Sequence, residues 1–264
     1  MPPSRPGPPV ATPGGMAQTL SVPIPGIHYF CDHRCWRCRL TDRCAVFGRW
    51  MTSEERQRAA KGGPTARVAS ALAVSLQVTM EDASVMLTSG AMADLSVRNG
   101  SRPDAVSIPP DDRAERAMSD PLVVRGSDYT RASWSVLRGL HAVLVRRGDA
   151  ASTDAAERLE EMCVTIASKV FRAVSSALDL DFDPADVQSD ANGSAKVALL
   201  LIAESRQAWQ VLMQPGRAAA NGAPARFVAT LDALEAEVLR RFPRAFEFRR
   251  PGFDADVNAT AAAS

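Results

Sequence analysis

The chain has 264 residues, a formal net charge of +1 and hydrophobic residues at 46% of its positions, which is enough apolar material for one large domain or two modest ones. A net charge near zero gives no overall attraction to nucleic acid, to an acidic substrate or to a membrane surface. The longest strongly apolar run, residues 197–203, is far shorter than the roughly 20 residues that a membrane-spanning helix needs.

Residues 1–26 are rich in Pro, Gly and Ser, and such a composition buries too little surface to offset the entropy lost on folding. We therefore predict a disordered N-terminal tail, in which Met16 is a second candidate for the translation start. The tail lacks the basic and apolar regions of a secretory signal, so we expect a cytoplasmic protein. In that reducing compartment, clustered cysteines favour metal binding or catalysis over disulfides.

Residues 27–51 form a cysteine-rich loop that contains four of the five cysteines, with His33 among them as a substitute ligand. Structural zinc sites usually take two ligand pairs from well-separated positions. A four-iron cluster accepts one thiolate at each iron, and a single wrapping loop can supply all four. The spacing therefore favours a 4Fe-4S cluster, with zinc as the alternative, and the predicted ligands are Cys31, Cys35, Cys38 and Cys44.

Basic and aromatic residues surround these cysteines. Guanidinium groups of Arg34, Arg37, Arg39 and Arg43 would offset the negative charge of a thiolate-bound cluster, although the chain is rich in arginine elsewhere. Between residues 28 and 61 there are eight Lys or Arg residues and four acidic ones, with Trp36, Phe47 and Trp50 interleaved. If the loop holds structural zinc, this patch predicts docking of a protein partner or of nucleic acid.

The segment Cys35-x2-Cys38-x5-Cys44, with Leu40 two places after the middle cysteine, resembles the last three ligand positions of the iron-sulfur loop in endonuclease III and the adenine-mismatch DNA glycosylases. The resemblance implies a ligand role for these three cysteines and makes Cys31 the fourth ligand, although the first cysteine of that family lies further upstream. Arg39 stands where the family often has proline. The helix-hairpin-helix and the glycosylase active-site pattern are missing, so no glycosylase activity is implied.

Two further similarities concern the same loop. Cys31-x3-Cys35-x2-Cys38 has the spacing of radical S-adenosylmethionine enzymes, but Arg37 replaces their usual aromatic residue and the helical remainder of the chain does not fit their βα barrel. As a whole, the cysteine loop, "DANGSAKVAL" and "RRPGFD" resemble a group of uncharacterised bacterial helical proteins with an N-terminal four-cysteine loop. That resemblance implies no particular activity.

Helical periodicity dominates residues 52–253 and predicts an all-α bundle of five to six helices. Thr153 is the predicted cap of one helix, and Asp183 and Pro184 are the predicted start of the next. Cys163 falls in an apolar stripe and is expected in the core. After the last helix we expect an extended segment over the bundle and a disordered tail at 254–264. The predicted helices span about 53–60, 65–97, 127–147, 153–177, 183–213 and 224–241, with a loop at 98–113.

The helix predicted at 183–213 contains the polar stretch "QSDANGSAK" directly before the most apolar run. One interpretation is a ligand-binding pocket of an enzyme. The interpretation that we favour is a helix N-terminus near Ser189 or Asp190, with Glu204 in a structural ion pair. The first interpretation would use the side chains of Asp190, Asn192, Ser194, Lys196 and Glu204. The sequence thus predicts a metal-binding protein with a redox or structural role, and leaves open whether it is an enzyme.

Overall fold

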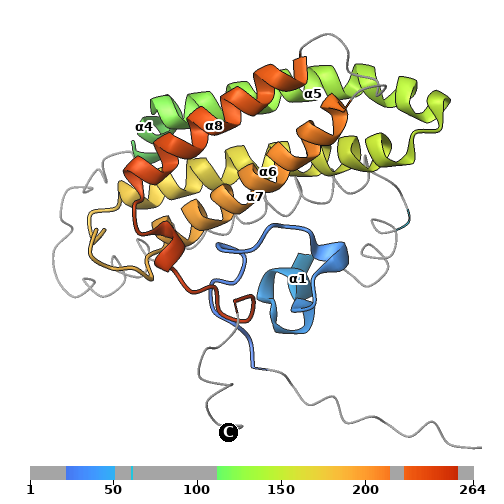
Figure 1. Ribbon diagram of the computed structural model, residues 1–264. Helices are drawn as coiled ribbons and strands as arrows, with labels where there is room; N and C mark the ends of the chain where they lie inside the picture. Colours follow the sequence, from blue (N-terminus) through green and yellow to red (C-terminus); the bar gives the residue numbers. More distant parts are fainter. Residues whose placement is uncertain (1–21, 51–60, 62–111, 215–222, 255–264) are drawn as a thin grey trace, which may run out of the picture.

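The computed structural model of the protein describes residues 22–50, 61, 112–214 and 223–254 (Figure 1). These residues contain six α-helices and no β-strand, so the predicted all-α fold class is confirmed. The helices predicted at 53–60 and 65–97 lie outside the described residues. Lys61, between the two ranges, is described and is helical. Most of the loop predicted at 98–113 and most of both predicted tails also lie outside them.

Four long helices form the bundle: α5 (Pro121–Arg147), α6 (Ala150–Ala177), α7 (Asp190–Met213) and α8 (Ala223–Arg241). The central helix α6 packs against α5 on one side and α7 on the other, while α8 packs on α7 and α5. The short helix α4 (Arg113–Ser119) covers one end of α6. The N-terminal cysteine loop and the C-terminal segment lie side by side beneath α6 and α7 (Figure 1).

The core follows the predicted apolar stripes. On α6, Leu159, Cys163 and Ile166 are completely buried, as predicted. Trp209 of α7 stacks on Phe227 of α8 with ring centroids 4.5 Å apart, and its indole Nε1–H donates a hydrogen bond of 3.1 Å to the hydroxyl of Tyr129 on α5. Each such side chain contributes about 1.5–3 kcal/mol by leaving water, so this layer joins three of the four long helices.

Two helix starts differ from the prediction. Helix α5 begins at Pro121 rather than near Ser127, because the Asp120 carboxylate accepts a hydrogen bond of 2.9 Å from the backbone N–H of Leu122 and proline suits the first helical position. The cap of α6 is Asp149 rather than Thr153, since its carboxylate accepts from the backbone N–H of Ser152 at 3.1 Å.

The predicted start of α7 at Asp183 and Pro184 is wrong, and the alternative start near Ser189 is correct. Asp183 and Asp186 accept hydrogen bonds from backbone N–H groups two residues further on, both at 2.8 Å. Two such bonds in succession form consecutive turns at residues 183–188 in place of a helix. Helix α7 instead begins at Asp190, and the hydroxyl of Ser189 caps it by accepting from the N–H of Asn192 at 3.3 Å.

The C-terminal segment covers the first turns of α7, as expected for residues 242–253. It contains the short 3-10 turn η3 (Ala245–Glu247), and the side chains of Phe242 and Phe248 are buried. The ring of Phe248 lies so close to Gly193 that a Cβ atom built there would be 2.8 Å from the ring carbon Cζ. A glycine in α7 therefore makes room for the C-terminal segment.

This contact predicts opposite effects for two Gly→Ala substitutions. Gly193→Ala is expected to lower the free energy of unfolding by about 1–3 kcal/mol, because overpacking against Phe248 outweighs the better helix propensity of alanine. Gly139 on α5 has no atom within 4 Å of an added Cβ, so Gly139→Ala is expected to stabilise the protein by about 0.5–1 kcal/mol. Urea denaturation of both variants measures the difference, and equal effects would contradict the close contact at Gly193.

Candidate metal centre

All four predicted ligands line one small cavity. The thiols of Cys31, Cys35, Cys38 and Cys44 share its wall with other side chains of the loop and with Phe253 from the C-terminal segment. None of the four forms a disulfide with another cysteine of the described residues. Within the part of the chain that the structure describes, no three His, Cys, Asp or Glu side chains are arranged as ready ligands of a single metal ion. The structure thus gathers the four thiols around a common space without forming a single-ion site.

The loop reaches this arrangement through three short helical turns. Cys35 opens the 3-10 turn η1 (Cys35–Arg37), η2 (Thr41–Arg43) follows, and the unpredicted helix α1 (Ala45–Trp50) begins directly after Cys44. These turns let two backbone N–H groups donate hydrogen bonds to cysteine sulfurs. The N–H of Leu40 donates to Cys38 Sγ and that of Phe47 donates to Cys44 Sγ, each with a nitrogen-sulfur distance of 3.4 Å. Hydrogen bonds of this kind stabilise metal-bound thiolates.

Cys35 is buried and Cys31 is partly buried. Burial raises the pKa of Cys31 to about 12, and its Sγ donates to the carbonyl oxygen of His28 at 3.6 Å. Burial also raises the pKa of Cys35 well above its usual value, and the neighbouring cysteines raise it further. Both side chains are therefore protonated thiols without a metal, and a metal that binds them displaces their protons.

The C-terminal segment forms part of the cavity wall through Phe253. Arg39 donates hydrogen bonds to the carbonyl oxygens of Gly252 and Phe253 at 3.1 and 3.3 Å. The ring of Phe30 contacts that of Phe253, with centroids 6.4 Å apart. Gly252 has φ +79°, and a Cβ there would be 2.8 Å from Ile24. The conspicuous "RRPGFD" motif thus packs against the cysteine loop, and Ile24, within the predicted N-terminal tail, is buried.

Asp254 fixes the end of this segment and predicts a pH dependence of stability. Burial alone would raise the pKa of Asp254, but hydrogen bonds from the Arg250 backbone and the Lys196 ammonium, together with the Arg250 guanidinium, lower it to about 2. Because the pKa of this carboxyl is lower in the folded protein than in the unfolded chain, its ionised form stabilises the fold at every pH above the ordinary carboxyl pKa. This contribution is lost as the pH falls toward 2. We expect Asp254→Asn to cost about 1 kcal/mol at neutral pH, after allowance for solvent screening. In urea titrations, the difference in free energy of unfolding between wild type and Asp254→Asn should shrink between about pH 4 and pH 2. A difference that stays constant over this range would contradict the lowered pKa of Asp254.

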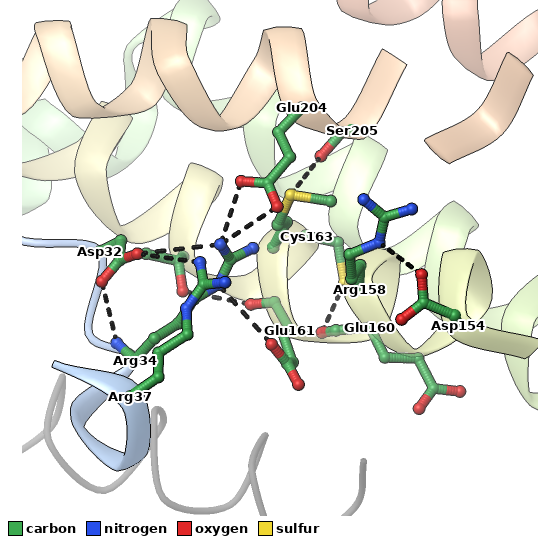
Figure 2. A network of polar contacts seen from close by, with 12 residues as sticks. Asp32, Arg34, Arg37, Asp154, Arg158, Glu160, Glu161, Cys163, Glu204 and Ser205 are labelled. Atoms are coloured by element: carbon green, nitrogen blue, oxygen red, sulfur yellow. Dashed lines mark hydrogen bonds and ion pairs between the residues drawn. The ribbon is translucent and has the colours of Figure 1, made fainter. Parts of the chain in front are cut away.

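Arg34 anchors the loop to the bundle (Figure 2). The side chain is only 3% exposed, and Nη1 donates to both carboxylate oxygens of Glu204 on α7 at 3.0 and 3.2 Å. Its Nε lies 3.6 Å from Oε2 of Glu161 on α6, which is 6% exposed. The sequence-based assignment of Arg34 to a surface basic patch is therefore wrong, whereas Arg37, which contacts Asp32, is exposed. The side chains of Arg49, Arg56 and Arg58 lie outside the described part.

A second anchor, Lys169, was not predicted. Lys169 on α6 is 1% exposed, and its Nζ lies 2.9 and 2.8 Å from the carbonyl oxygens of His28 and Tyr29 and 3.0 Å from Nε2 of His33. The sequence contains one signal for this role, because Lys169 follows Ile166 at helical spacing in an otherwise apolar stripe. A lysine there needs buried partners.

The polar stretch of α7 is used for contacts with other segments. The Asp190 carboxylate accepts from Arg172 at 2.7 Å, and the Asn192 amide donates to the carbonyl of Asp186 at 3.0 Å. The Ser194 hydroxyl donates to the carbonyl of Tyr29 at 3.4 Å, while Lys196 binds Phe248 and Asp254. Together with Glu204, all five residues of the predicted pocket therefore hold neighbouring segments in place. Asp190 alone also borders an open hollow beside α4.

No family model, curated protein or solved structure matches the chain. The resemblance to the endonuclease III loop thus stays a prediction about the ligand role of Cys35, Cys38 and Cys44. Among the described helices, none is both long and apolar enough to cross a membrane.

Proposed function

We propose that the protein binds a 4Fe-4S cluster through Cys31, Cys35, Cys38 and Cys44, with a redox or structural role. The observation that carries this proposal is the position of all four thiols on the wall of one cavity. Three segments far apart in the sequence enclose that cavity or hold its wall: the loop, α6 with α7, and the C-terminal segment. A reducing cytoplasm would keep the thiols available for the metal.

The residues around the cavity fit an anion-like group. Arg34 lines the cavity, and its Nη2 is buried with no hydrogen-bond partner among the residues that the structure describes. A buried donor without a partner costs about 1–3 kcal/mol. The sulfurs of an iron-sulfur cluster accept hydrogen bonds, and four thiolates leave the cluster with net negative charge. The positive charge of Arg34, which lines the cavity, would offset this negative charge.

The cysteine side chains also fit both parts of the proposed role. When bound, such a cluster supplies one-electron redox chemistry. Cys38 and Cys44 are only partly buried, so one edge of the centre lies near the surface, where a redox partner can approach. Cys35 is buried and would connect the loop to the inner side of the centre, whereas Cys31, like Cys38 and Cys44, is partly buried.

A single zinc ion is the alternative occupant, because four thiolates suit both metals. It would cross-link the same loop without redox chemistry. The two occupants differ in composition, so chemical analysis separates them.

The proposal is tested by anaerobic purification followed by quantification of iron, acid-labile sulfide and zinc. We expect a brown protein with about four iron and about four sulfide per chain, and visible absorption that bleaches on reduction. About one zinc per chain without iron would support the zinc alternative. A colourless protein with neither metal would refute a metal centre.

A further inference from the structure

A buried lysine lies directly behind the wall of the cysteine cavity. Lys169 Nζ has three neighbours within hydrogen-bond distance: the carbonyl oxygens of His28 and Tyr29 and the ring Nε2 of His33. A charged ammonium group has three N–H donors and no acceptor. All three neighbours belong to the segment that leads into the first two cysteines.

The same arrangement holds the ring of His33 in place. Its Nε2 lies 3.0 Å from Lys169 Nζ and 3.1 Å from the carbonyl oxygen of His28. His33 has φ +57°, a region that costs a residue other than glycine about 1–3 kcal/mol and persists only where neighbours hold it. His33 lies between Cys31 and Cys35 in the chain and lines the same cavity. The contact with Lys169 therefore helps to set the direction in which both thiols point.

The charge of Lys169 also lies close to the first ligand. Cys31 Sγ and Lys169 Nζ contact the same carbonyl oxygen of His28, at 3.6 and 2.9 Å. A buried cation is costly unless a negative group compensates it. The nearby carboxylate of Asp190 binds Arg172 instead, at 2.7 Å. A cluster bound to four thiolates would place negative charge at Cys31, close to the Lys169 ammonium, and would so compensate this buried cation.

We propose that Lys169 is a positioning residue of the metal centre, which holds residues 28–33 in the shape that brings Cys31 and Cys35 to the cavity. Its charge additionally favours the reduced state of the centre, which carries one more negative charge. The positioning role is a property of the metal-free protein, whereas the charge effect rests on the proposed function.

The positioning role is tested with metal-free, reduced protein, by the rate at which iodoacetamide alkylates Cys31 and Cys35, followed by mass spectrometry. The variants are Lys169→Met and Lys169→Gln. We expect both to increase the two rates by about tenfold or more, since loss of the three bonds opens the segment. The matched control is Arg206→Met, which removes a partly buried cation of α7 that pairs with Asp232 and Glu235 of α8. It should change the rates by less than about twofold.

Unchanged alkylation rates in a folded Lys169 variant would overturn the positioning role. Lys169→Gln keeps a neutral N–H donor and so decides the question if Lys169→Met does not fold. A redox titration of the iron-loaded protein with dithionite tests the charge effect. We expect the midpoint potential of Lys169→Gln to be more negative than that of wild type and of Arg206→Met, and an equal potential would overturn the charge effect. If wild type binds no iron, the proposed function and the charge effect both fail, whereas the alkylation rates still decide the positioning role.

Discussion

Replacing Cys35 with alanine is expected to reduce the iron content of anaerobically purified protein from about four ions per chain to below about one. Cys35 is the most buried of the four predicted ligands and the first residue of η1. Its loss leaves one corner of the centre without a thiolate in a site that is largely closed to other ligands. Iron and sulfide analysis of the variant, beside wild type prepared in the same way, measures the effect.

Cys163→Ala is the matched control for this experiment. Cys163 is also a buried cysteine, but it lies in the core of α6, and its Sγ donates to the carbonyl of Glu160 at 3.4 Å. The control should retain the full iron content with a small loss of stability. Retention of iron in Cys35→Ala, or an equal loss in both variants, would contradict the assignment of Cys35 as a ligand.

The second large effect is expected for Arg34→Met, which should lower the free energy of unfolding by about 3–5 kcal/mol. The substitution removes the buried cation that contacts both Glu161 and Glu204, and the loss of one partner from a buried ion pair leaves a carboxylate poorly compensated. Because these contacts join the cysteine loop to α6 and α7, we also expect the variant to bind less metal. Urea denaturation and metal analysis measure the two effects.

Arg37→Met provides the comparison, because Arg37 is 54% exposed and lies 3.4 Å from the Asp32 carboxylate. Such surface pairs contribute about 0–1 kcal/mol. A double-mutant cycle with Glu204→Gln should show coupling between residues 34 and 204 and little between residues 37 and 204. Equal costs for both arginine substitutions would show that Arg34 does not anchor the loop.

Much of the bundle could be predicted from the sequence because its signals are local. The apolar stripe of α6 repeats at helical spacing. Helix α5 ends at Arg147, directly before Gly148, which has φ +66° as expected for a glycine that stops a helix. Local signals also explain the errors. Asp-Pro occurs at both 120–121 and 183–184, and both aspartates accept from the N–H two residues further on, yet only the first pair begins a helix. After the second pair, Asp186 makes another turn of the same kind. The two pairs differ in their surroundings rather than in their own sequence.

The candidate site could be predicted only where its residues are neighbours in the chain. The four cysteines occupy one short loop, so their spacing identified them. The partners of that loop are far away in the sequence, since Glu204 lies 170 residues after Arg34, and Lys169 lies 141 residues after His28. No local pattern connects such residues. The polar stretch of α7 also looked like a ligand pocket, although its side chains bind Tyr29 and Phe248 of the neighbouring segments.

X-ray absorption spectroscopy of anaerobically purified wild type, at the iron and zinc edges, tests the metal centre most directly. We predict a first shell made only of sulfur around iron, together with a second shell of iron neighbours, as a cluster held by four thiolates requires. A shell of sulfur around zinc, without metal neighbours, would show that the four cysteines bind one zinc ion instead of a cluster. A first shell of nitrogen and oxygen, or the absence of bound metal, would contradict a shared centre at Cys31, Cys35, Cys38 and Cys44.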